Sequence, residues 1–72
     1  MKKINKIKIK LNGKLKTLKD NTLLIHFLKK LNIPIKKVAI ELNKEIVDKK
    51  KISRINLKNN DKIEIVHFIG GG

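Results

Sequence analysis

The sequence predicts an α+β domain in which one helix packs on one face of a small mixed sheet of four to five strands. Three observations support this prediction. Short runs alternate between apolar and polar residues, an Asn-Gly pair separates the first two of these runs, and one apolar stripe at helical spacing follows them. A chain of 72 residues with 40% hydrophobic residues can form one small core. One helix can cover one face of such a sheet.

The first predicted element is a β-hairpin. Residues 6–11 alternate between lysine and Ile or Leu, which is the pattern of a half-buried strand. Asn12 and Gly13 follow, and both tolerate the left-handed backbone of a two-residue hairpin turn. The return strand is predicted over residues 14–18.

A helix of about ten residues is predicted next, because apolar residues recur there at helical spacing. Asn21 or Thr22 can cap its first N–H groups. Asn32 can close it, and Pro34 prevents its continuation. The stripe consists of Leu23, Leu24, Phe27, Leu28 and Leu31. We expect the last four of these to pack on Ile7, Ile9, Ile40, Ile63 and Ile65.

The second half of the chain contains the remaining strands. We predict a strand at 38–42, followed by a tight turn at 43–45 and a short strand at 46–47. A solvated loop at 48–51 and a short irregular element at 52–57 come next. A turn at 59–61 then leads into the last strand, at 62–69. The last strand is apolar on both faces, as expected of a central strand.

Composition excludes several function classes. The chain has no cysteine, so disulfides, cysteine-based metal sites and a cysteine nucleophile are excluded. No apolar stretch approaches the roughly 20 residues of a membrane-spanning helix. The basic start lacks the apolar region of a secretion signal. We expect a cytoplasmic protein, or one of the plastid stroma if it is organelle-encoded.

The net charge of +13 raises the possibility of nucleic-acid binding, and other features argue against it. Arg54 is the only arginine, whereas readers of bases depend on arginine. Phe27 and Phe68 are the only aromatic residues, which leaves few platforms for base stacking. Lysine, isoleucine and asparagine fill more than half of the chain, and A/T-rich codons encode all three. A biased genome therefore explains the lysines more simply than a phosphate-binding surface.

No residues suggest catalysis by this chain. The six acidic residues form no evident pair at a cleft, and Ser53 has no histidine obviously near it. His26 and His67 are two separated histidines, too few to form a metal site. We expect no metal, no bound cofactor and no enzymatic activity.

The sequence ends in Gly70, Gly71 and Gly72, directly after an apolar run. Glycine can adopt almost any backbone angle, and chain ends fray unless something holds them. We therefore divide the chain into a folded domain, 1–69, and a slim tail, 70–72, that could enter a narrow active site of another protein.

Two segments resemble a known family. Residues 38–47 (VAIELNKEIV) and 57–72 (LKNNDKIEIVHFIGGG) are similar to the ThiS family, the sulfur carriers of thiamine biosynthesis, which have the β-grasp, or ubiquitin-like, fold. The resemblance covers nearly the whole chain. Asn60 stands where the family usually has glycine, but asparagine also tolerates left-handed angles. The charge is far more positive than the family leads us to expect.

The resemblance implies a function for the tail. A ThiF-type, E1-like enzyme would use ATP and Mg²⁺ to adenylate the carboxylate of Gly72. Sulfur from a cysteine desulfurase relay would then displace AMP, and the resulting thiocarboxylate would supply a ThiG-type thiazole synthase. The chemistry fits, because an ionised carboxylate is a poor electrophile until it is activated. Two alternatives stay open: a ubiquitin-like modifier or binding module, and a molybdopterin-type sulfur carrier.

The outer face of the sheet is the predicted docking surface for these partners. If Ile63 and Ile65 point to the helix, alternation turns Glu64, Val66 and Phe68 to the other face. The same rule turns Lys8 and Lys10 outward on the first strand. We expect an apolar centre of Val66 and Phe68, with Glu64 and the lysines as its charged rim.

Overall fold

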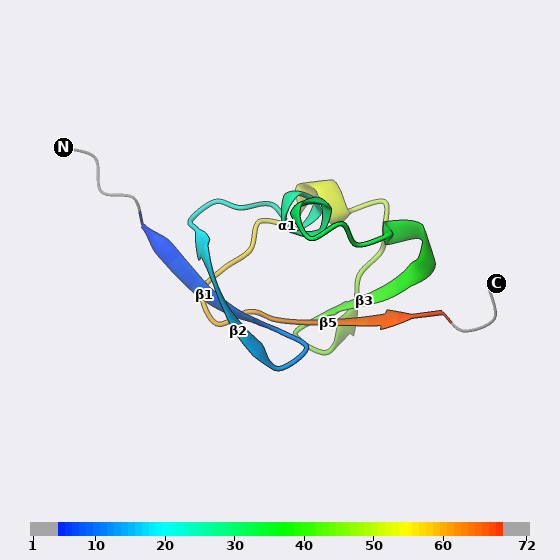
Figure 1. Cartoon of the computed structure of the whole chain (residues 1–72). Helices are drawn as coiled ribbons and strands as arrows, with labels where there is room; N and C mark the ends of the chain where they lie inside the picture. The colour runs from blue at the N-terminus through cyan, green and yellow to red at the C-terminus, as the bar shows by residue number, and fades with distance from the viewer. Residues whose placement is uncertain (1–4, 69–72) are drawn as a thin grey trace.

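The computed structural model describes residues 5–68. Its elements are β1 (Lys6–Leu11), β2 (Lys14–Lys19), α1 (Leu24–Lys30), the 3-10 helix η1 (Ile35–Lys37), β3 (Val38–Leu42), β4 (Glu45–Ile46), the 3-10 helix η2 (Ile52–Arg54) and β5 (Lys62–His67). Figure 1 shows α1 above one face of the sheet, and no helix of residues 5–68 covers the opposite face. The predicted α+β architecture is therefore confirmed, with five strands and one α-helix. Over residues 5–68, every helix is too short to cross a membrane.

The strand order is β2-β1-β5-β3-β4. β1 and β5 are parallel, and the other neighbouring pairs are antiparallel. The first and last strands are thus neighbours, and β5 is central as predicted. β5 carries apolar residues on both faces, and α1 covers only one of them, so Glu64 and Val66 are exposed on the other.

The core lies between α1 and the covered face of the sheet. Its eleven buried residues are Ile7, Ile9, Leu24, Phe27, Leu28, Val38, Ile40, Ile52, Leu57, Ile63 and Ile65. This set includes every predicted core residue except Leu31, which is 38% exposed. Leu31 differs because α1 ends at Lys30, and Asn32 then takes a left-handed backbone, φ 59°, that turns the chain away.

Asparagine produces most of the tight turns. Asn12 and Gly13 both have positive φ, 48° and 83°, as the hairpin prediction requires. The turn between β3 and β4 uses Asn43 and Lys44 in the same way. Asn60 has φ 73°, so the asparagine that replaces the usual glycine adopts the left-handed conformation.

The start of α1 differs from the prediction. Within residues 5–68, the helix has no side-chain cap, and its N-cap residue is Leu23. The Thr22 hydroxyl instead donates to the Lys19 carbonyl at 2.7 Å. The chain after η2 holds the helix start, since Leu24 N–H donates to the Ile55 carbonyl at 2.9 Å. Tertiary contacts therefore replace the local cap, and the helix has seven residues instead of about ten.

Candidate functional site: the outer face of the sheet and the end of β5

The proposed sulfur-bearing tail, Gly70, Gly71 and Gly72, lies outside the described residues, as does Ile69. The division into residues 1–69 and 70–72 is therefore still a prediction. The strand that leads to this tail is described up to Phe68, with β5 ending at His67. The candidate site is the outer face of the sheet around β5, on the side away from α1.

Alternation along β5 is as predicted. Ile63 and Ile65 point to the core, and the intervening Glu64 and following Val66 point outward. The contrast is large between consecutive residues: Ile65 is 8% exposed and Val66 is 58% exposed. Lys8 and Lys10 also alternate with buried isoleucines, so they lie on the same outer face.

The register between β1 and β5 separates the predicted docking residues into two groups. Lys10 pairs with Lys62, at the start of β5, and β1 ends one residue later. Val66 is four residues further along β5, or about 13 Å at the usual rise of a strand. Lys8 and Lys10 instead line a cavity of about 310 Å³ with Leu15, Asn60 and Lys62. The structure therefore does not place these lysines as a rim around Val66.

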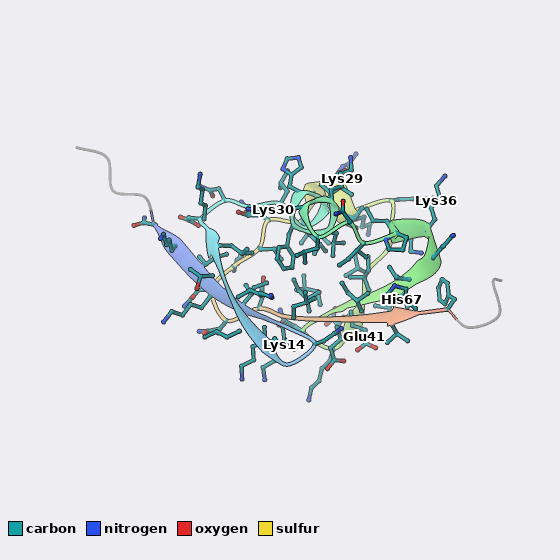
Figure 2. All side chains as sticks on the ribbon, viewed as in Figure 1. Lys14, Lys29, Lys30, Lys36, Glu41 and His67 are labelled. Atoms are coloured by element: carbon teal, nitrogen blue, oxygen red, sulfur yellow. The ribbon has the colours of Figure 1, made fainter. Side chains whose placement is uncertain are left out.

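The neighbours of Val66 come from β3 and β4. Ala39 lies opposite Val66, and Glu41 lies opposite Glu64. Ile46 of β4, the most exposed large hydrophobic residue within residues 5–68, lies opposite Glu41. Figure 2 shows Glu41 below the sheet, on the side away from α1. This half of the outer face thus combines exposed apolar side chains with two carboxylates. Directly opposed like charges are unfavourable in a sheet.

Phe68 lies one residue beyond β5. Its N–H donates to the Lys37 carbonyl at 3.0 Å, so the β3–β5 ladder continues through it. The ring is 50% exposed, and Lys49 Nζ lies 5.2 Å from the ring centroid. This is the distance of a cation–π contact. The prediction that Phe68 is exposed instead of completing the core is confirmed, and its lysine neighbour is Lys49.

Asn12 extends the sheet where β1 ends. Its backbone N–H donates to the Ile63 carbonyl at 2.8 Å. Its side-chain Oδ1 accepts from Ile65 N–H at 2.8 Å, and Nδ2 donates to the Ile65 carbonyl at 3.4 Å. The side-chain amide thus takes the place of one further β1 residue. Sequence reasoning identified Asn12 only as a turn residue, and the pattern contains no signal for this second role.

Similar contacts fix the start of β5. Asn59 Oδ1 accepts from Lys8 N–H at 2.8 Å, and Asn43 Oδ1 accepts from Lys62 N–H at 2.9 Å. Asp61 joins them, because Oδ1 accepts from the Asn43 amide at 3.0 Å and Oδ2 accepts from Lys58 N–H at 2.7 Å. These hydrogen bonds thus fix the start of β5 against β1 on one side and against the β3–β4 turn on the other, ahead of Glu64 and Val66. Figure 1 shows it then extending past the hairpin towards the C-terminal end.

The two histidines lie apart from this arrangement. His26 is exposed on α1, and His67 is exposed at the end of β5. Across residues 5–68, no group of three or more His, Cys, Asp or Glu side chains is placed to hold a metal ion. The described surface offers apolar side chains, charged groups and a strand held by side-chain hydrogen bonds.

Comparisons with known proteins give a consistent result. The ThiS family model matches residues 9–72. The sulfur carrier protein ThiS of Bacillus subtilis is 42% identical over 65 residues, which are 89% of this chain and 98% of that protein. The crystal structure of the thiamine biosynthesis protein ThiS from Geobacter metallireducens matches with a TM-score of 0.81 and 26% identity, covering 92% of this chain and all of that one.

Two further relatives are longer proteins. The thiazole synthases of Magnetococcus marinus and Paramagnetospirillum magneticum are 41% and 36% identical over 66 residues. The match covers 92% of this chain, which spans about a fifth (20%) of the length of each synthase. The fold and the matched length therefore agree with the resemblance seen in the sequence, and the chain belongs to the ThiS family.

Proposed function

We propose that this chain is a sulfur carrier of thiamine biosynthesis, and that it is a cosubstrate of other enzymes and not a catalyst. The observation that carries the proposal is the 42% identity to a sulfur carrier over 98% of that carrier's length. The architecture supports it. A rigid sheet fixes a central strand whose sequence leads directly into the glycine run.

The proposed chemistry takes place at Gly72. Its carboxylate oxygen attacks the α-phosphorus of ATP on a ThiF-type enzyme that supplies Mg²⁺, and pyrophosphate leaves. The outer persulfide sulfur of a cysteine desulfurase relay then attacks the acyl carbon, and AMP leaves. A thiol reductant cleaves the resulting acyl disulfide, which releases the thiocarboxylate and leaves a disulfide on the reductant side. This order follows from the poor electrophilicity of a free carboxylate. With no cysteine in the chain, no side chain can carry a persulfide, so the sulfur is placed on the carboxyl carbon.

A thiazole synthase is the proposed acceptor of this sulfur. In two relatives named thiazole synthase, a segment similar to this chain occupies about a fifth (20%) of the protein. Covalent joining of a carrier-like domain to a synthase supports a working partnership between the two. In the present chain, the exposed Val66, Ile46 and Phe68 are the apolar contacts that a ThiG-type synthase or the adenylating enzyme could cover.

The proposal is tested by incubating the chain with a ThiF-type enzyme, MgATP and sulfide, followed by intact-mass measurement. We expect a mass increase equal to the difference between a sulfur and an oxygen atom. Deletion of Gly72, or addition of one residue after it, should abolish the increase. Gly71→Val should reduce it, because a β-branched residue is bulky and stiff in a narrow channel.

Each alternative gives a different result. A ubiquitin-like modifier would form amide bonds to lysines of other proteins. A molybdopterin-type carrier would form the thiocarboxylate but would not support thiazole formation by the synthase. A chain blocked at Gly72 that still gains sulfur would contradict the proposed site. Circular dichroism of each variant should match the parent chain, because the changes lie beyond β5.

A further inference from the structure

We propose that the outer edge of β2, together with the cleft between β2 and α1, binds an extended acidic segment of another protein, which joins the sheet as an added strand. This inference does not depend on the carrier function. It rests on the unpaired edge of β2, the shape of the adjoining cleft and the distribution of charge over the molecule.

The edge of β2 offers free backbone groups. β2 is the outermost strand on its side of the sheet and is six residues long. Asp20 N–H donates to the Asn5 carbonyl at 2.8 Å, and alternation then directs the backbone groups of Lys16 and Leu18 towards β1. Those of Leu15 and Thr17 point away from β1. Within residues 5–68, neither of these two residues makes a backbone hydrogen bond outside the strand ladder.

A cleft of about 450 Å³ adjoins this edge. Leu18 and Phe27 supply its apolar lining, and Lys6, Lys19 and Lys30 supply its charge. Thr17, Thr22 and His26 complete the lining, so none of the described residues that line the cleft carries a carboxylate. Figure 2 shows Lys30 on α1, above the sheet. A strand placed beside β2 would direct every second side chain into this cleft, where one apolar side chain fits against Leu18 and Phe27.

The charge distribution indicates which kind of segment can bind at the edge of β2. Residues 6–19 contain six lysines and no acidic residue. Five of the six acidic residues lie in the interval from Glu41 to Glu64. A second copy of the chain would place β2 lysines against β2 lysines, and edge lysines are a common means of preventing such pairing. The same lysines attract an extended segment with acidic residues, since opposite charges directly across a sheet are favourable.

The position of the edge leaves the end of β5 accessible. Lys6 and Lys19, at the cleft, are the two ends of the hairpin strands that lie far from the turn. Figure 1 shows that β5 leaves the sheet at the opposite end of the molecule. A segment bound along β2 can therefore occupy its site while the C-terminal part of the chain is engaged elsewhere.

The test uses the full chain labelled with ¹⁵N and a synthetic peptide, acetyl-Asp-Val-Glu-Ile-Asp-Val-Glu-amide. We expect saturable binding, chemical-shift changes concentrated on β2 and α1, and slower hydrogen exchange of the Leu15 and Thr17 amides. A peptide of the same sequence with N-methyl groups on alternate residues keeps its charge and cannot extend the ladder. It should bind about tenfold more weakly, because each lost backbone hydrogen bond costs on the order of 1 kcal/mol.

Charge variants of the protein test the role of the lysines. Lys6→Glu with Lys19→Glu should weaken binding about tenfold, because these two paired lysines lie on the same face of the hairpin and line the cleft, and their attraction to an acidic segment becomes repulsion. The matched control is Lys36→Glu with Lys37→Glu, which changes the net charge equally at η1, away from β2 (Figure 2). This control should alter the dissociation constant by less than about threefold.

The backbone is tested separately by Leu15→Pro, which removes an outward N–H, against Leu15→Ala, which keeps it. Only the proline variant should bind weakly. If Leu15→Pro does not fold, the comparison of normal and N-methylated peptides still tests hydrogen bonding by the outward backbone groups of β2 in the parent chain. Equal binding of both peptides, shift changes spread over all surface lysines, or no binding at millimolar peptide would overturn the proposal. None of these results depends on thiocarboxylate formation.

Discussion

Phe27 and Phe68 are the only aromatic residues of the chain, and they lie in opposite environments. Phe27 is 3% exposed, between α1 and the covered face of the sheet. Phe68 is 50% exposed at the end of β5, with the Lys49 ammonium group over its ring. The same side chain thus stabilises the fold on one side and offers a contact surface on the other. Burial, and not residue type, determines which role each phenylalanine has.

The outer face itself is divided. Its β1–β2 half carries lysines without acidic residues, and its β3–β5 half carries Glu41, Glu64 and exposed apolar side chains. The net charge of +13 is therefore not spread evenly. This division separates an apolar and acidic half near the end of β5 from a basic half at the hairpin.

The largest effect should come from the covered face. Phe27→Ala should lower the free energy of unfolding by about 3–5 kcal/mol, because it removes a buried ring and leaves a cavity. Urea unfolding followed by circular dichroism measures the loss. Phe68→Ala is the matched control and should change the free energy of unfolding by less than about 0.5 kcal/mol. Equal losses for the two variants would contradict the division between core and contact surface.

The next effect should come from Asn12, which connects the hairpin to β5. Asn12→Ala should lower the free energy of unfolding by about 1–3 kcal/mol, since Ile65 N–H loses its acceptor in a partly buried position. Asn12→Gly separates the loss of the side-chain amide from the loss of the left-handed turn, because glycine lacks the amide but keeps the left-handed backbone. Hydrogen exchange should show a faster Ile65 amide in both variants. A stable Asn12→Gly variant with an unchanged Ile65 amide would show that only the turn conformation matters.

Docking should distinguish the end of β5 from the basic half of the outer face. Phe68→Ala should weaken binding to the ThiF-type enzyme and to the thiazole synthase by about 1–3 kcal/mol, the range of a contact residue at an interface. Isothermal titration calorimetry measures both complexes. Leu15→Ala removes an exposed apolar side chain from the basic half and is the control. Weaker binding of the Leu15 variant alone would move the docking surface to the hairpin.

The smallest effect should come from the facing carboxylates. Glu64→Gln should raise the free energy of unfolding by about 0.2–1 kcal/mol, because it removes the repulsion between directly opposed like charges. Salt should reduce this gain, since screening weakens exposed charges. Glu45→Gln, at a position opposite Leu42, is the control and should bring no such gain. A gain from Glu45→Gln equal to that from Glu64→Gln would show that the repulsion is not local to the pair.

The local elements and the faces of the strands follow from the sequence alone. Alternation in residues 6–11 and 38–42 and the Asn12-Gly13 turn predict strands that the structure contains. The apolar stripe predicts the buried face of α1, including Phe27. These predictions succeed because they depend on periodicity and turn chemistry, which act between residues close in the chain. The family likewise follows from contiguous segments.

The arrangement between distant segments was determined by tertiary structure. Alternation shows that Lys10 and Val66 point to the same face, but only the register of β1 and β5 shows that they lie far apart along it. The start of α1 was also determined by a contact between distant segments, because the Ile55 carbonyl replaces a local cap. Asn12 and the Glu41–Glu64 pair acquire their roles in the same way. Sequence patterns therefore determined which face each side chain occupies, whereas packing of α1 and pairing of distant strands determined which side chains meet, because these contacts join residues that no local pattern connects.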